Sequence, residues 1–177
     1  PGLRRPRGQG DPVRPGQTVN LQVDIQCAST EPVPEEDDIR SWILATLAGR
    51  RSGDTEISLR LVDIPEMTTL NQGYRKKSGP TNVLSFPSDL PPELELPLLG
   101  DIVICVPVVR EEARVQSKAL EAHWAHMTVH GTLHLLGYDH IEEVEAEAME
   151  AMETDILKTL NYPCPYQDNL SKEHAGA

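Results

Sequence analysis

The stretch from residue 130 to residue 140, His-Gly-Thr-Leu-His-Leu-Leu-Gly-Tyr-Asp-His, constrains this chain more than any other part of its sequence. His130 and His134 are four residues apart, so on a helix they lie one turn apart on the same face. Gly137 can end such a helix, because glycine adopts the left-handed conformation that terminates helices. The next three residues can then fold the chain back and bring His140 toward the other two imidazoles. The stretch predicts three histidines meeting at a helix C-terminus.

Three convergent imidazoles are the ligand set of a catalytic zinc site, which leaves the fourth tetrahedral position to water or substrate. We therefore predict that His130, His134 and His140 bind one catalytic Zn²⁺; nickel, copper and iron are alternative metals for imidazole ligands. Five of the six histidines lie between residues 123 and 140. A helix end that is merely rich in histidine explains this concentration poorly.

The same histidine spacing occurs in the metzincin proteases, in which a glutamate follows the first histidine and acts as the general base. Here that position is Gly131. The predicted ligands are retained but the proteolytic base is missing, which makes a peptidase the less favoured hydrolase.

Length, charge and composition limit the kind of protein that this chain can be. The chain has 177 residues, enough for one domain with a full core, and a net charge of −12. This charge predicts a soluble protein without an overall field that attracts nucleic acid, so a polyanion would need a local basic patch. Three cysteines without a CxxC pair are typical of reduced thiols in a cytosolic protein. No run approaches about 18 apolar residues and the start lacks an apolar signal core, so neither a membrane span nor secretion is predicted and a cytoplasmic location is expected.

Three segments are predicted along the chain. Residues 1–18, rich in proline, glycine and arginine, predict a disordered extension. Residues 19–162 form the predicted metal-dependent hydrolase domain, and residues 163–177 a flexible tail. Apolar periodicity predicts four strands, at residues 19–25, 57–61, 83–86 and 100–106. It also predicts five helices, at residues 35–49, 63–74, 108–117, 118–136 and 144–160. This pattern favours a single α+β domain with a small mixed four-stranded sheet covered by about five helices.

The last predicted helix carries apolar residues every four positions, and these predict its packing face: Val144, Ala148, Met152, Ile156 and Leu160. Glu150 and Glu153 could each approach a histidine ligand, but we place both on the solvated face. His123 is predicted to lie on the surface. His126, one turn before His130, is either a contact to a ligand or substrate or a buried hydrogen-bonded histidine, and both alternatives stay open.

The predicted domain contains one compact basic cluster, formed by Arg75, Lys76 and Lys77. The cluster either binds an anionic substrate or ends a helix, where cations complement the helix dipole.

Taken together, these segments resemble the YbeY family of metal-dependent bacterial endoribonucleases. The resemblance covers about residues 20–162 and is carried by the histidine stretch together with Asn71-x-x-Tyr74-Arg75, Thr81-Asn82-Val83-Leu84-Ser85-Phe86 and Gly100-Asp101-Ile102. It implies that His130, His134 and His140 are zinc ligands and that Arg75 is the family's essential arginine. It also implies a cytoplasmic enzyme for single-stranded RNA that acts in maturation of the 3′ end of the small-subunit ribosomal RNA and in ribosome quality control.

Our leading hypothesis is hydrolysis of an RNA phosphodiester. The forked guanidinium of Arg75 would bind phosphate, Lys76 and Lys77 would steer the strand, and His126 is a candidate substrate contact. The general base stays open between metal hydroxide, His126 and the RNA 2′-hydroxyl.

Two alternatives remain. One is a hydrolase of another bond, such as a peptidase. The other is a noncatalytic ribosome-assembly factor whose metal is structural, with His126 or Asp139 as a fourth ligand. The negative net charge favours a ribosomal or assembly protein as a partner that helps to recruit the RNA.

Overall fold

A computed structural model of the chain describes residues 18–94, 96–139 and 141–166. Its strands are β1 (Val19–Cys27), β2 (Gly53–Val62), β3 (Val83–Pro87) and β4 (Leu98–Cys105). Its helices are α1 (Glu36–Leu47), α2 (Ile64–Arg75), α3 (Val106–Val115), α4 (Leu120–Leu135), α5 (Glu143–Thr159) and the short 3₁₀ helix η2 (Pro92–Leu94). Every predicted strand and helix is present, including the break before α4. Residues 1–17 of the predicted extension and 167–177 of the predicted tail lie outside the described residues.

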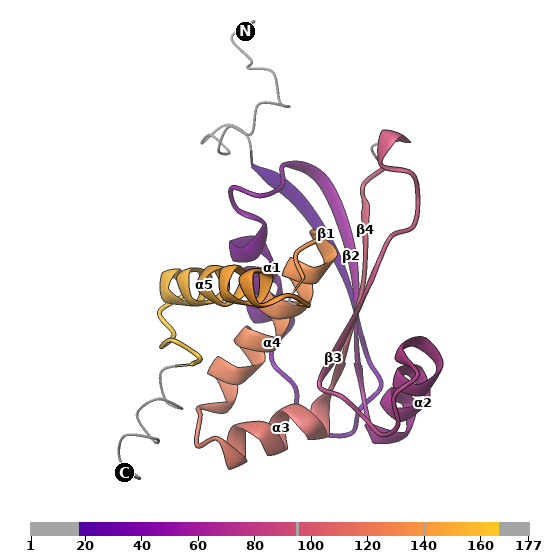
Figure 1. Cartoon of the computed structure of the whole chain (residues 1–177), viewed down its shortest axis with the longest axis vertical. Helices are drawn as coiled ribbons and strands as arrows, with labels where there is room; N and C mark the ends of the chain where they lie inside the picture. Colours follow the sequence, from indigo (N-terminus) through magenta and orange to yellow (C-terminus); the bar gives the residue numbers. More distant parts are fainter. Residues whose placement is uncertain (1–17, 95, 140, 167–177) are drawn as a thin grey trace, which may run out of the picture.

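The four strands form one mixed sheet in the order β1-β2-β4-β3. The pairs β1–β2 and β2–β4 are parallel, whereas β3 runs antiparallel to β4. Helices α1, α4 and α5 lie on one side of the sheet and α2 on the other (Figure 1). The predicted α+β class with a small mixed sheet is therefore confirmed.

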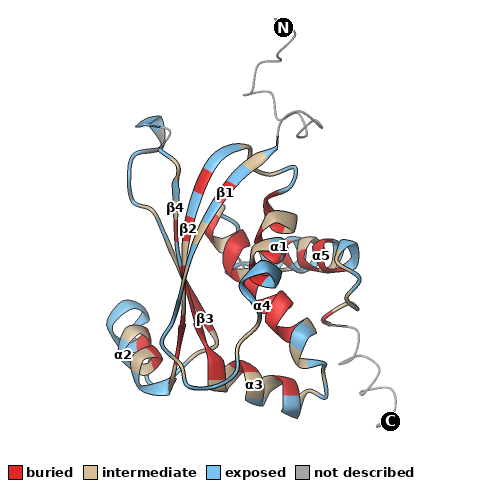
Figure 2. Cartoon of the chain, turned by 180° about the vertical axis from the view of Figure 1, so that it is seen from behind, coloured by how far each residue is buried: buried red, intermediate tan, exposed pale blue. Residues whose placement is uncertain are grey.

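Helix α4 is the most buried helix of the fold. It packs against α1, α3, α5 and strands β3 and β4, so that side chains around its circumference are enclosed (Figure 2). Trp124, Met127 and Leu133 of this helix are all buried. His123 is buried as well, with 3% of its surface exposed, so its predicted surface position is wrong. The prediction failed because α4 is enclosed on all sides and has no solvated face at that point.

Gly131 sets the distance between α4 and the sheet. A Cβ at this position would lie 3.0 Å from Ile102 Cγ2 and 3.2 Å from Val83 Cγ2. The carbonyl of Gly131 accepts a hydrogen bond of 2.8 Å from the Ser85 hydroxyl on β3. Close packing on β3 thus brings the C-terminal half of α4 beside the strand.

Helix α5 packs through a different face from the one predicted. Its buried residues are Met149, Glu153, Ile156 and Leu157. Val144, the first residue of the predicted face, is 77% exposed. Four residues span about 400° of helix, so a series with this spacing drifts about 40° at each step. The predicted series therefore begins in solvent at Val144 and reaches the core from Met152 onward.

None of the helices in the described part of the chain is both long enough and apolar enough to cross a membrane.

Candidate functional site

The end of α4 has the geometry that the histidine stretch predicts. The helix ends at Leu135, and Gly137 follows with a φ of 103°, in the left-handed region. The Gly137 N–H donates to the carbonyl of His134 at 3.0 Å, and the Tyr138 N–H donates to the carbonyl of Leu133 at 3.1 Å. The chain thus turns where glycine permits it. His140 lies outside the described residues, so its approach to the other two histidines stays a prediction.

His130 and His134 point their Nε2 atoms at one another. The two nitrogens are 3.1 Å apart, and the ring centroids are 4.6 Å apart. Two imidazole nitrogens bound to one tetrahedral zinc at 2.0–2.1 Å would be separated by about 3.3 Å. The pair therefore fits a shared zinc ion. The described residues alone contain no group of three His, Cys, Asp or Glu side chains suited to a metal, since the third predicted ligand is His140.

Glu153 of α5 lies behind this pair, fully buried. Its Oε2 is 2.5 Å from His130 Nδ1, and its Oε1 is 2.9 Å from His126 Nε2. Burial opposes ionisation of this carboxyl, but the hydrogen bonds from the two imidazoles outweigh burial and hold its pKa below the ordinary value. We had placed Glu153 on the solvated face, which is wrong, whereas Glu150 is exposed as expected.

His126 is the buried, hydrogen-bonded histidine of the two alternatives. Only 7% of its surface is exposed, and its Nε2 is bonded to Glu153. Burial lowers the pKa of the imidazole, which favours the neutral ring. His126 is not among the described residues that line the cleft described below, and its contact with a substrate stays a prediction.

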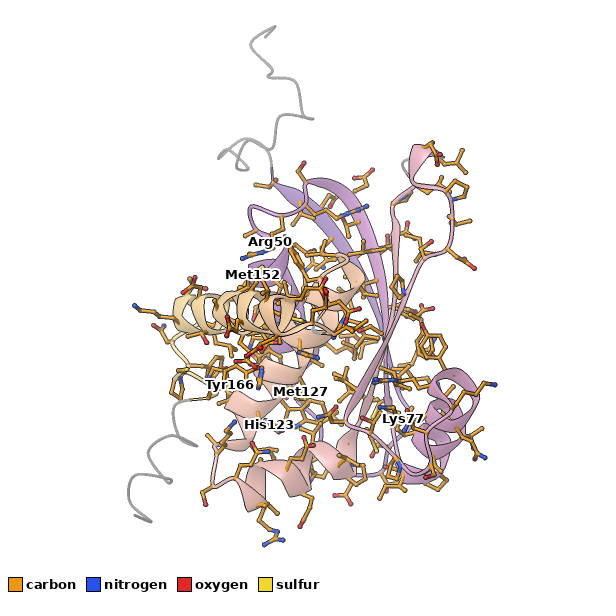
Figure 3. The ribbon with its side chains drawn as sticks, viewed as in Figure 1. Arg50, Lys77, His123, Met127, Met152 and Tyr166 are labelled. Atoms are coloured by element: carbon orange, nitrogen blue, oxygen red, sulfur yellow. The ribbon has the colours of Figure 1, made fainter. Side chains whose placement is uncertain are left out.

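The first residues of the predicted tail also reach this region. The Tyr166 hydroxyl donates to Glu153, and Lys118 Nζ donates to the carbonyl of Pro165 at 2.6 Å. His123 is a residue of α4 and Tyr166 lies beside that helix, whereas Lys77 lies at the end of α2 (Figure 3). Residues up to Tyr166 therefore pack on the domain.

A second carboxylate, Glu112 of α3, holds a neighbouring set of polar groups. It accepts hydrogen bonds from Asn82 Nδ2 at 3.2 Å and lies 2.9 Å from His123 Nε2. Burial raises the pKa of Glu112, but the hydrogen bonds from His123 and Asn82 more than offset it, and the net pKa is lowered. The Asn82 side-chain oxygen accepts from the Val83 N–H at 2.7 Å. The Asn82 amide is thus held at both ends.

One cleft of about 710 Å³ joins α2, β3 and the end of α4. It brings Arg75 together with His130 and His134, as we expected for a shared site. The other lining residues are Tyr74, Thr81, Asn82, Val83, Leu84, Ser85, Pro87, Gly137, Tyr138, Asp139 and Ile141. Lys76 and Lys77 follow Arg75 at the end of α2, where Lys76 takes a left-handed φ of 59°, and neither is among the described residues that line the cleft.

Two tyrosines of the cleft are partly open to solvent. Tyr74 is 54% exposed and packs edge-on against Phe86, with ring centroids 4.4 Å apart. Tyr138 is 38% exposed. These rings were not singled out as site residues from the sequence, although Tyr74 adjoins Arg75 and Tyr138 lies inside the histidine stretch.

Comparison with known proteins gives consistent matches. Residues 24–161 match the family model described as Endoribonuclease YbeY. A protein of that name from Pseudomonas syringae pv. tomato is 54% identical over 155 residues, which cover 87% of this chain and 93% of the relative. Its counterpart from Cellvibrio japonicus is 52% identical over 148 residues, covering 83% and 84%. The solution structure of TM1509 from Thermotoga maritima superposes with a TM-score of 0.56 at 25% identity, covering 77% of this chain and 87% of that one.

Proposed function

This chain belongs to the YbeY endoribonuclease family, and from that premise we propose that it is a zinc-dependent endoribonuclease that cuts single-stranded RNA. We further propose that it acts in the cytoplasm, in maturation of the 3′ end of the small-subunit ribosomal RNA and in ribosome quality control. Ribosomal or assembly proteins are the expected partners that help an acidic chain to find RNA.

The observation that carries the proposal is the shared cleft, which is lined both by a forked cation and by a pair of converging imidazoles. His130 and His134, with His140 as the third ligand, would hold the zinc ion. When bound, zinc supplies a Lewis acid that polarises a phosphoryl oxygen. Arg75 would orient the same phosphate through paired N–H donors, which lysine cannot present in that geometry.

The exposed rings of Tyr74 and Tyr138 support a single-stranded substrate. A base can stack on an aromatic side chain only when it is unpaired and turned out of a duplex. The two rings lie in the same cleft as Arg75. A strand bound through its phosphate at Arg75 would therefore meet a stacking surface beside it.

The structure argues against a peptidase and against His126 as a fourth metal ligand. A peptidase would need a base at position 131, but Gly131 packs directly on Ile102 and Val83. A closed structural metal site could use His126 as a fourth ligand, but its Nε2 is bonded to Glu153. The same bond argues against His126 as the general base.

The test pairs zinc content with cleavage of a single-stranded RNA, in the wild type and in His134→Ala. We expect about one zinc per chain, loss of cleavage on chelation, recovery on zinc addition, and loss of both zinc and cleavage in the variant. A zinc-loaded wild type that never cleaves RNA would contradict the enzymatic proposal and favour the noncatalytic assembly factor. Cleavage that is unaffected by chelation would contradict the role of zinc.

A further inference from the structure

We propose that Glu153 is a positioning residue whose carboxylate fixes the tautomer and ring orientation of His130, an inference that rests on the proposed role of His130 as a zinc ligand. Both carboxylate oxygens are used. Oε2 meets His130 Nδ1 at 2.5 Å, while Oε1 meets His126 Nε2 at 2.9 Å and also accepts from the Tyr166 hydroxyl. One buried side chain thus connects the cleft histidine to a buried histidine and to the chain after α5.

The chemistry of the contacts fixes where the His130 proton lies. A carboxylate accepts hydrogen bonds and donates none, so the ring nitrogen that faces it must carry the hydrogen. A neutral imidazole with its proton on Nδ1 has its lone pair on Nε2. That atom faces His134 Nε2 at 3.1 Å. Glu153 therefore selects the tautomer that presents a metal-binding lone pair to the cleft.

The burial of the partners shows why this contact orients the ring firmly. The side chain of Glu153 is 1% exposed, that of His126 8% and that of His130 22%. His126 and His130 lie one helical turn apart, with the carboxylate bridging them from α5. His126 contacts one oxygen of the carboxylate within the core. His130 contacts the other oxygen and lines the cleft.

The segment after α5 completes the arrangement. Tyr166 donates to the same carboxylate oxygen that His126 contacts, and its ring centroid lies 5.5 Å from that of His126. The bond from Lys118 Nζ to the Pro165 carbonyl ties this segment to the start of α4. With water excluded from the carboxylate, its hydrogen bonds are stronger than they would be at the surface.

The first test compares Glu153→Gln with Glu150→Gln, the same substitution at an exposed position of the same helix. A glutamine places an N–H₂ donor against one of the two imidazoles and so no longer enforces the tautomer of both. Zinc affinity is measured by competition with a chromogenic chelator, alongside thermal unfolding. We expect Glu153→Gln to lower zinc affinity by about 10- to 100-fold. Glu150→Gln should stay within about twofold of the wild type. A folded Glu153→Gln protein with wild-type zinc affinity would overturn the proposal.

The second test needs no variant. Nitrogen-15 NMR of the zinc-free wild type reports which nitrogen of each histidine is protonated. We expect His130 to carry its proton on Nδ1, and a proton on Nε2 would overturn the proposal even if Glu153→Gln does not fold. Both readouts are independent of RNA cleavage. A wild type that binds zinc but does not cut RNA would therefore count against the proposed function alone.

Discussion

The cleft has two sides that are built differently. On the histidine side, formed by His130 and His134, the supporting helix is enclosed by the rest of the domain and a fully buried carboxylate holds one ring. On the arginine side, formed by Tyr74 and Arg75, both residues are exposed at the end of α2. A metal centre requires ligands held in one geometry, whereas an RNA strand can be bound by side chains that adapt to it. Under the proposed function, the histidine side would be preorganised for the metal and the arginine side would adjust to the substrate.

Arg75→Ala is expected to give the largest difference between the effect on RNA cleavage and the effect on zinc binding. Loss of a charged hydrogen-bonding group that contacts phosphate should lower RNA cleavage by about 10- to 100-fold. Zinc affinity should stay at the wild-type value, because Glu153 and α4 are untouched. Cleavage kinetics and chelator competition measure the two effects, and Arg75→Lys shows how much of the activity needs the fork rather than the charge. A loss of only about threefold or less, in a folded protein, would refute the phosphate contact.

Two glycine-to-alanine substitutions, one on each side of the cleft, test how closely the supporting helices are packed. In Gly131→Ala the new methyl group meets Ile102 and Val83 in the core, which should destabilise the protein by about 1–3 kcal/mol. In Gly73→Ala on α2 the methyl group meets nothing within 4 Å. That change should stabilise the protein by about 0.5–1 kcal/mol, because alanine favours helix over glycine. Urea unfolding measures both, and equal signs would contradict the close packing of α4 on β3.

On the arginine side, Tyr74→Leu tests base stacking. Leucine retains the apolar contact with Phe86 but has no aromatic face, so binding of an unpaired oligonucleotide should weaken by about 1 kcal/mol, roughly fivefold. Fluorescence anisotropy with a short single-stranded RNA measures this, and a duplex of the same sequence serves as the control. An equal loss for both RNAs would argue against stacking.

The smallest effect concerns pH and the Glu112 carboxylate. Because its pKa is lower in the folded protein than in the unfolded chain, its contribution to stability is fully present above the unfolded value, about 4.3. It is lost as the pH falls through the folded value. Glu112→Gln should therefore lower the urea midpoint at pH 7 and lose less stability than the wild type on acidification below about pH 4. If the two proteins lose stability in parallel, the His123 and Asn82 contacts do not stabilise the fold.

The sequence predicted the structure best where a few adjacent residues determine the local conformation. The helix stop at Gly137 and the one-turn spacing of His130 and His134 depend on a few adjacent residues, and both are found as predicted. The sheet and its helices also followed from periodicity, since burial of an apolar face determines each element.

Contacts between residues on different helices could not be predicted from such local patterns. Glu153 lies on the apolar face of α5, in line with Met149 and Ile156, and that placement was the signal for a buried carboxylate. We missed it because a strict four-residue series was followed instead of the helical repeat. His123 was misplaced for a related reason, because the burial of α4 is set by α3 and α5, which contact it only in the folded chain.

The most direct measurement of the division between the two sides is zinc content and RNA cleavage in Arg75→Ala and His134→Ala, measured on the same preparations. Arg75→Ala should keep about one zinc per chain and lose cleavage, whereas His134→Ala should lose both. Loss of zinc from Arg75→Ala, or wild-type cleavage of RNA by His134→Ala, would contradict this division of the cleft.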